Sequence, residues 1–411
     1  DGYRLPHIVK LPACDMHPSS CGDHSIQEYR GKLYTSAILS GQNWNVFTLN
    51  YSDSIQQKPA IDAGNLVLDN GRVRYEFDCQ GHLLKGMFKE SGFEFTYSGI
   101  GNDLRLYADE PHVYDAWDIE YYYPEMECSM VECISASRSA DGPVFSALRF
   151  SFRAGSSIIE QDVILPNDSD EIYFRTKVLW HEEKKLLRVS FPCDPMADFC
   201  TSDIPYGEIR RKTHVQNEWD AASFEFPARL FTDVSNGRGV ALASDCKYGY
   251  SVRDGRIGLS LLRSPLDPDP YADQGEHEFT YALIPHETSL PSSPVREIAS
   301  YLSSSHLAII SEEIPAFASA SSGYEVAGDH VHITAYKIAE DGQGAILRLA
   351  ETDGCRSAVR IISHRPGYML AECNLMEERL SDGLIDTEPV AFSPYEIKTF
   401  REVRIPGMYS C

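Results

Sequence analysis

The chain has 411 residues, of which 43% are hydrophobic and 11% aromatic, and its formal net charge is −24. This length exceeds the usual size of one hydrophobic core, so we expect two or three domains. Nucleic acids and anionic membranes would be repelled by such a charge, which argues against both as partners, whereas a neutral glycan is compatible with it. No apolar run approaches the ~20 residues that are needed to span a bilayer.

Residues 1–59 show the weakest pattern, and a strand is expected there only at Trp44–Asn50. Upstream lies a cluster that offers two sulfurs and two ring nitrogens, the ligand types of a structural zinc site: Cys14, His17, Cys21 and His24. Their spacing is tight, and the aspartates between them suit an ordinary polar turn. We therefore expect a loop without metal there.

The cysteines and the first residue bear on the origin of the chain. Eleven cysteines are an odd number, many lie in apolar strand-like surroundings, and no secretory segment precedes them. We expect mostly reduced, buried thiols and a cytoplasmic protein. Because the chain starts at Asp1 and not at a methionine, we also expect a fragment of a longer protein.

Short stretches of alternating apolar residues, separated by turn sequences, begin near Leu66. Residues 66–68 and 73–77 flank Asp69–Gly71, a turn of the kind that joins a tight hairpin. Further strands are expected at residues 83–88, 93–97, 145–152, 157–165, 172–180 and 186–191. Strands at this spacing indicate antiparallel sandwich sheets and not alternating βαβ units.

The stretch Leu261–His286 is predicted to be a hairpin with a long polar tip. A short apolar run opens it, and alternating apolar residues at 279, 281 and 283 close it. Three prolines and one glycine restrict the loop between them. Loops on a rigid β scaffold often carry binding groups, although a solvated acidic turn is an equally simple interpretation.

One helix is predicted, because Ser293 and Pro294 form a start signal and apolar residues follow at helical spacing up to Leu302. We place the last domain boundary just beyond this helix. Strand and turn patterns resume after it, with strands expected at residues 331–336, 345–349, 358–362 and 396–400.

Four segments resemble the C-terminal half of glycoside hydrolase family 38, in its cytosolic and bacterial α-mannosidase branch: Tyr114–Asp118, Trp180–Pro192, Asp245–Tyr250 and Leu261–His286. They occur in the order of the family, and the resemblance extends from Gly64 to Arg401. It implies an all-β fold with a central supersandwich like that of galactose mutarotase, flanked by small β-sandwich domains. We expect a small β segment or linker domain at 1–59, the supersandwich at 60–304 and a C-terminal β-sandwich at 305–411.

Candidate carboxylate pairs for glycoside hydrolysis exist at Asp115 with Asp118, and at Asp267 or Asp269 with Asp273. Aspartates in loops more often cap turns and accept backbone hydrogen bonds, so we do not assign catalysis to them. In the family, the zinc ligands, the nucleophile and the acid/base lie in the N-terminal half. Neither His-x-Asp nor His-His occurs in this chain. The resemblance thus implies that this chain holds no catalytic residue and no metal, and that it is inactive alone.

Loops of the family's C-terminal sandwich reach the bound sugar, and the matching positions are our candidate substrate-binding residues: Tyr114, Asp115, Trp117, Asp118, Arg263, Asp267, Asp273, Gln274 and His277. Carboxylates and amides can bind vicinal hydroxyls, and Trp117 can cover an apolar sugar face. Trp117 could equally be a core aromatic residue. Arg263 is expected to pair with Asp267 or Asp273, and both segments should lie side by side on one rim.

The implied function is that of the non-catalytic C-terminal portion of a zinc-dependent, retaining α-mannosidase that acts on glycans or oligosaccharides. Its expected partners are a mannose-containing glycan and the N-terminal catalytic domain of the same protein, with a second copy of the chain in a homo-oligomer as a further candidate. One alternative is a stand-alone carbohydrate-binding β-sandwich without hydrolytic activity. Another is an independent mutarotase or polysaccharide lyase, which would need its own acid/base pair.

Overall fold

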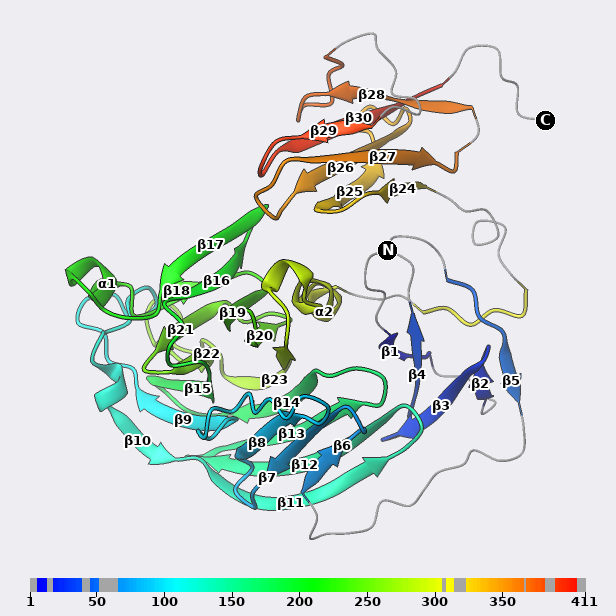
Figure 1. Cartoon of the computed structure of the whole chain (residues 1–411). Coiled ribbons are helices and arrows are strands. Elements are labelled where there is room, and N and C mark those ends of the chain that lie inside the picture. Colours follow the sequence, from blue (N-terminus) through cyan, green and yellow to red (C-terminus); the bar gives the residue numbers. More distant parts are fainter. Residues whose placement is uncertain are drawn as a thin grey trace.

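The computed structural model describes residues 6–12, 18–38, 45–51, 66–304, 308–313, 323–365, 367–380 and 389–404. Strands dominate this part of the chain, which confirms the all-β class (Figure 1). Its helices are few and short: α1 (Glu218–Ala222), η1 (Tyr123–Glu125), η2 (Leu290–Ser292) and α2 (Val295–Ser303). None of the helices in these ranges is long and apolar enough to cross a membrane.

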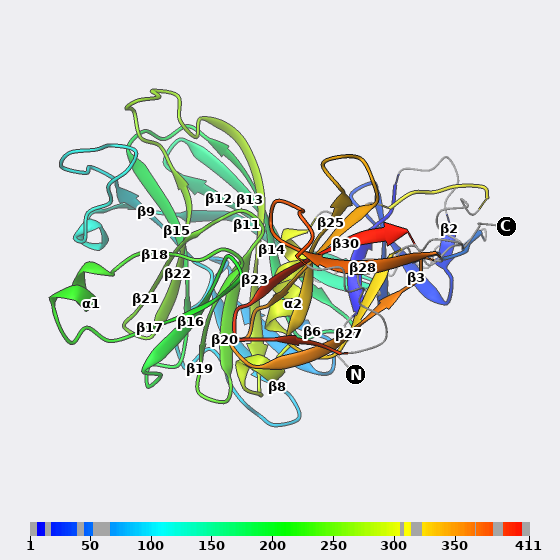
Figure 2. The same ribbon diagram turned by 90° about the horizontal axis from the view of Figure 1, so that it is seen from above.

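Two large antiparallel sheets form the centre of the molecule (Figures 1 and 2). The nine-stranded sheet contains, in spatial order, β11 (Glu132–Asp141), β12 (Phe145–Ala154), β13 (Ser157–Pro166), β14 (Ile172–Trp180), β23 (Gly275–His286), β20 (Gly239–Ser244), β19 (Phe231–Ser235), β16 (Phe199–Ile204) and β17 (Gly207–Lys212). The six-stranded sheet contains β10 (Glu127–Met130), β9 (Asp103–Ala108), β15 (Lys185–Pro192), β22 (Arg256–Arg263), β21 (Gly249–Arg253) and β18 (Phe226–Pro227).

The inner faces of the two sheets share one hydrophobic core. Phe174 of β14 stacks on Tyr281 of β23 with ring centroids 5.0 Å apart, and it lies 5.3 Å from Phe191 of β15 in the opposite sheet. All three rings are fully buried. The Tyr281 hydroxyl donates to Asn102 (2.8 Å) and accepts from Gln161 (2.8 Å), so the one polar atom of this stack is satisfied.

A three-stranded sheet, β6 (Val67–Asp69), β7 (Val73–Phe77) and β8 (Leu83–Phe88), packs against the same core. β6 and β7 form the hairpin predicted around Asp69–Gly71. The strand predicted at Phe93–Tyr97 is wrong, because only Glu94 makes a bridge, to Met87. Phe93 and Phe95 are buried, but Tyr97 and Ser98 adopt positive φ angles of 46° and 59° and turn the chain away.

The predicted hairpin at Leu261–His286 is also wrong. β22 pairs with β15 and β21, whereas β23 pairs with β14 and β20, so the two strands belong to different sheets. The loop between them therefore crosses from one sheet of the sandwich to the other at the end of these two strands. Trp180, buried at the end of β14, donates its indole N–H to Ser264 Oγ (3.2 Å) and links the sheets at this crossing.

An N-terminal sheet packs against β12 and β13: β1 (Pro6–Lys10), β4 (Lys32–Ile38), β3 (His24–Tyr29), β2 (Pro18–Cys21) and β5 (Leu49–Tyr51). Gln27 of β3 accepts the backbone N–H groups of Val144 and Phe145 and donates to the Phe145 carbonyl, which anchors this sheet. It has more strands than the sequence indicated. Of the strand expected at Trp44–Asn50, only its end coincides with β5, and Trp44 lies outside the described residues.

Two C-terminal sheets enclose a core of their own and lie above the large sandwich in Figure 1. One contains β24 (Tyr324–Ala327), β27 (Ser357–Ser363) and β29 (Val390–Phe392), and the other β25 (Val331–Ile338), β26 (Ala345–Glu351), β30 (Ile397–Arg404) and β28 (Tyr368–Cys373). Helix α2, confirmed close to its predicted place, links both parts. Its Arg296 lies 2.6 Å from Glu208 of β17 and 3.3 Å from Asp353. The domain boundaries given above stay a prediction.

Candidate functional site

The ends of three neighbouring inner strands, β9, β15 and β22, lie together at one end of the six-stranded sheet. β9 ends and β15 begins here, and Asp109 N–H donates to the Lys184 carbonyl (2.9 Å) between them. β22 ends beside them, where Lys184 N–H donates to the Ser264 carbonyl (2.8 Å). Two loops therefore leave the sheet side by side. We call residues 109–122 the first rim loop and residues 264–274 the second rim loop.

Arg263, the last residue of β22, joins the two loops through a buried carboxylate. Its Nε and Nη2 donate to the two oxygens of Asp109, with Nη2–Oδ1 at 3.1 Å, in a bidentate pair. Asp109 is only 2% exposed. Burial raises the pKa of Asp109, and the hydrogen bond and charge of Arg263 oppose that shift. The stability of a buried carboxylate such as that of Asp109 therefore depends on its cationic partner, Arg263.

The same guanidinium also binds the backbone of the first rim loop. It donates to the carbonyls of Asp115 (3.0 Å), Ala116 (3.3 Å) and Asp118. The expectation that Arg263 pairs with Asp267 or Asp273 is thus wrong, because its ion-pair partner is Asp109, 154 residues away in the chain. Most of its donors are used inside the protein, so Arg263 acts as a positioning residue for the loop.

Asp115 provides a second connection between the loops. Its Oδ2 accepts the N–H groups of Leu266 (2.7 Å) and Asp267 (3.2 Å), and its buried Oδ1 lies 3.7 Å from Lys184 Nζ. The juxtaposition of Tyr114–Asp118 with Arg263–His277 on one rim is therefore confirmed. The carboxylate that we had considered for catalysis or for sugar binding serves here to hold the loops together.

The end of the second rim loop is fixed in the same way. Asp273, with φ of 59°, accepts the backbone N–H of Arg263 (3.0 Å), and its carbonyl lies 2.7 Å from His277 Nε2. Gln274 donates from Nε2 to the Glu182 carbonyl (2.6 Å). These three predicted site residues thus contact the backbone of their own rim.

Aromatic side chains on the rim point to solvent. Trp117 is 68% exposed and Tyr114 59%, and their rings meet edge to face with centroids 6.3 Å apart. The alternative that Trp117 is a core residue is therefore wrong. Tyr271 of the second rim loop, which we had not selected, is 78% exposed. The carboxylate of Asp118 is half-buried and that of Asp267 exposed, and neither forms an ion pair within the described ranges.

Candidate metal ligands give a negative result. Among the described residues, no group of three or more His, Cys, Asp or Glu side chains could hold a metal ion. Of the predicted N-terminal cluster, Cys14 and His17 lie outside the described residues. Cys21 and His24 face each other across the β2–β3 turn, and His24 contacts the Phe47 ring edge-on.

The nine cysteines that the structure describes are all unpaired. Four of them are buried, two are half-buried, and three, Cys79, Cys128 and Cys246, are exposed. The expectation that the thiols are mostly buried thus holds for fewer than half of this set. Burial raises the pKa of both Cys193 and Cys200, in the second case to about 11, which disfavours the thiolate form at neutral pH.

Two family models match the chain. The glycosyl hydrolases family 38 C-terminal domain covers residues 68–271, and the family 38 C-terminal beta sandwich domain covers residues 330–400. Both rim loops lie wholly or mostly within the first match.

Relatives and solved structures agree with these models. Human alpha-mannosidase 2C1 is 33% identical over 81% of this chain, which spans 33% of that protein, and alpha-mannosidase G of Dictyostelium discoideum is 32% identical over 97%, spanning 39%. The alpha-mannosidase structure from Enterococcus faecalis V583 shares the fold, with a TM-score of 0.67 at 15% identity over 97% of this chain and 55% of that one. The chain spans well under half the length of these curated relatives. The chain belongs to glycoside hydrolase family 38 and corresponds to the C-terminal part of the proteins in that family.

Proposed function

We propose that this chain is the non-catalytic C-terminal portion of a zinc-dependent, retaining α-mannosidase that hydrolyses α-mannosides in glycans or oligosaccharides. Its two rim loops form one wall of the sugar site, and the N-terminal catalytic domain of the same protein completes that site. The observation that carries the proposal is the joint fixation of two distant loops by Arg263, which leaves aromatic and carboxylate side chains exposed beside each other.

The predicted site residues divide into two roles. Arg263, Asp115 and Asp273 bind the backbone of the loops and set their shape. Trp117 and Asp118 remain for the ligand. An exposed indole covers the apolar face of a pyranose ring, and a half-buried carboxylate accepts hydrogen bonds from vicinal hydroxyls. A pair of loops with this composition suits a neutral sugar.

Zinc would be held outside this chain. The family resemblance places the zinc ligands in the N-terminal half, and among the described residues no cluster of side chains fits the ion. We assign no step of the reaction to residues of this chain, and we place the nucleophile and the acid/base in the N-terminal domain. Free thiols, including exposed ones, are compatible with a cytoplasmic location.

The experiment compares the chain alone with a longer protein that also contains the N-terminal domain, using an aryl α-mannoside. We expect turnover only for the longer protein. In it, Trp117→Ala should lower kcat/KM by about tenfold, from the loss of one apolar contact with the sugar, while the metal content stays unchanged. Trp219→Ala, at an 85% exposed site on α1, is the matched control and should leave kcat/KM unchanged.

Two results would reject the proposal. Turnover by the chain alone would place catalysis in this half, as in an independent enzyme. Saturable mannoside binding by the chain alone, together with an inactive longer protein, would favour the stand-alone carbohydrate-binding sandwich.

A further inference from the structure

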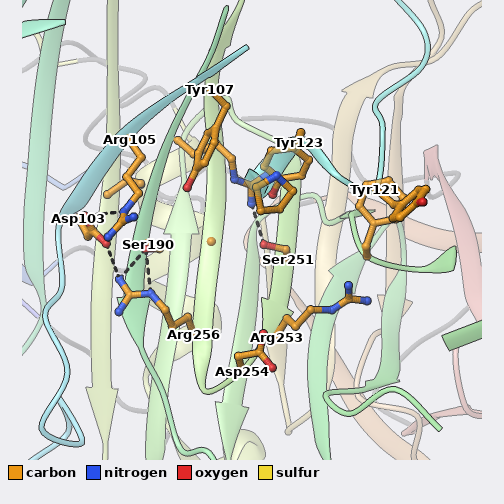
Figure 3. A pocket seen from close by; sticks show the side chains of 15 residues that line it. Asp103, Arg105, Tyr107, Tyr121, Tyr123, Ser190, Ser251, Arg253, Asp254 and Arg256 are labelled. Atoms are coloured by element: carbon orange, nitrogen blue, oxygen red, sulfur yellow. Dashed lines mark hydrogen bonds and ion pairs between the residues drawn. The ribbon is translucent and has the colours of Figure 1, made fainter. Parts of the chain in front are cut away.

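A concavity of about 190 Å³ opens on the outer face of the six-stranded sheet (Figure 3). Leu104, Leu106 and Leu259 of this sheet face the core, whereas the alternate residues of the same strands face the concavity. None of the residues predicted for the mannoside site lines it. The lining is rich in arginine: Arg105, Arg188, Arg253 and Arg256.

Small residues form the floor. Ser190 of β15 pairs with Gly258 of β22, which pairs with Ser251 of β21, so three small residues lie in one row across neighbouring strands. A Cβ atom on Gly258 would lie 2.7 Å from Arg188 Nη2 and 2.8 Å from Ser251 Oγ. Glycine thus lets the Arg188 guanidinium lie flat against the floor and keeps the concavity open.

Arg188 is held in place although it is only 5% exposed. It forms an ion pair with Glu225, donates to Ser260 Oγ (2.9 Å) and Ser251 Oγ (2.7 Å), and lies over the Tyr123 ring at 5.2 Å. A buried cation with this many partners is fixed before any ligand arrives.

Arg105 and Arg256 bind the same carboxylate of the lining, that of Asp103. Arg105 Nε and Arg256 Nη2 both donate to Asp103, at 3.0 Å and 3.1 Å, and Arg256 also donates to Ser190 Oγ. Asp103 is only 6% exposed and has these two cations for neighbours. Its acceptor capacity is therefore taken up by the protein.

Arg253 differs from the other three. Its side chain lines the concavity from the end of β21, and within the described ranges its guanidinium has no hydrogen-bond or ion-pair partner (Figure 3). The neighbouring Asp254 sits exposed in the turn between β21 and β22. All donors of one arginine thus remain available at the mouth of the concavity.

The hydrogen-bond inventory decides the ligand class. Guanidinium groups offer donors only, and the carboxylates of Asp103 and Glu225 are occupied by Arg105, Arg256 and Arg188. The exposed carboxylate of Asp254 lies in the turn beside Arg253, and four guanidinium groups outnumber the two carboxylates of the lining. A neutral sugar carries no charge to balance the unpaired guanidinium of Arg253. An oxyanion carries acceptors only and matches the geometry of guanidinium forks. We propose that this concavity binds a small oxyanion of the phosphate type.

The walls suggest how much of a ligand fits. Tyr107 and Tyr123 meet edge to face with centroids 5.3 Å apart, and Tyr121 and Phe224 continue the aromatic side. The phosphate group is either free or carried on a small molecule whose body lies against these rings. The site does not rest on the mannosidase proposal, because all of its residues belong to this chain and its readout is binding.

The test titrates the chain with inorganic phosphate, glucose 6-phosphate and glucose by calorimetry at low and high salt. We expect saturable, salt-sensitive binding of phosphate and no binding of glucose. Tighter binding of glucose 6-phosphate than of phosphate would identify a phosphorylated sugar as the source of the oxyanion, and equal binding would identify free phosphate.

Variants keep the proposal falsifiable. Arg253→Gln, at a half-buried strand end, should weaken phosphate binding about tenfold or more, because a charge-assisted hydrogen bond is lost. Asp254→Asn should tighten it, on the order of twofold to fivefold. Arg153→Gln, an exposed residue of β12, is the matched control and should change nothing.

If Arg253→Gln and Arg153→Gln bind phosphate with the same affinity, the bound phosphate is an adventitious ion only. That result would overturn the proposal. Absence of saturable phosphate binding would do the same. Binding of glucose in place of phosphate would identify a neutral sugar site and contradict the inventory of donors.

Discussion

Removing the Arg263 side chain should open the rim without unfolding the sandwich. Arg263→Ala leaves Asp109, 2% exposed, as a buried carboxylate without its partner, and it frees the carbonyls of Asp115, Ala116 and Asp118. Breaking a buried pair by removing one partner costs about 3–5 kcal/mol. Because the Arg263 side chain keeps 22% of its exposure, we expect the low end, about 3 kcal/mol.

Native-state hydrogen exchange measures this loss where it occurs. The N–H groups of Leu266 and Asp267 are bonded to Asp115, so their protection reports the closed rim. A loss of about 3 kcal/mol corresponds to exchange roughly 100-fold faster at these two amides. Amides that exchange through fluctuations in which the Arg263–Asp109 pair stays intact should keep their protection.

The matched control removes a surface arginine with a similar bidentate partner. Arg72 pairs with Asp170, but its side chain is 55% exposed, so Arg72→Ala should cost less than about 1 kcal/mol. Equal protection of Leu266 in the wild type and in Arg263→Ala would refute the reasoning, because the rim would then not depend on this ion pair. Restoration of protection by adding Asp109→Asn would support it, since the unpaired charge is then gone.

Two further predictions concern stability. Burial lowers the pKa of His286, but the hydrogen bond and charge of Asp233 outweigh it, so the folded pKa lies above the ordinary 6.5. The stabilisation is complete below 6.5 and is lost as pH rises through the folded value, and a pH series of urea unfolding should show this slope in the wild type but not in His286→Asn. Gly258→Ala should cost about 1–3 kcal/mol in the same assay, because its Cβ would displace the Arg188 guanidinium, whereas Gly249→Ala in the adjacent strand, with its closest contact at 3.2 Å, should cost less.

Local patterns were enough for much of the fold. Alternation and turn residues predicted the β6–β7 hairpin, and the Ser293-Pro294 start signal predicted α2. The partners of each strand could not be predicted from local patterns, because they are set by contacts between segments that are distant in sequence. β22 and β23 follow each other in the chain, yet each finds its partners elsewhere, so the expected hairpin at Leu261–His286 was wrong. Side-chain alternation is the same in both arrangements.

The candidate site, like the fold, could be predicted from the sequence only in part. Family resemblance indicated that two loops share one rim, and their backbone hydrogen bonds confirm it. The partner of Arg263 could not be found in this way. Asp267 and Asp273 are close in sequence, whereas Asp109 is brought near only because β9 and β22 flank β15 in the sheet. One signal was missed: Leu104 and Leu106 alternate with polar residues, as in a half-buried strand, and Asp109 directly follows this segment.

The most direct test of the central claim is a structure of the longer protein, with its N-terminal domain, bound to an unreactive mannose analogue. The account predicts that the Trp117 ring lies within about 4.5 Å of the sugar and that Asp118 or Asp267 accepts a hydrogen bond from a sugar hydroxyl at about 2.5–3.0 Å. Arg263 should still hold Asp109 in that complex. A sugar bound with both rim loops beyond contact distance would contradict the claim that this half forms a wall of the site.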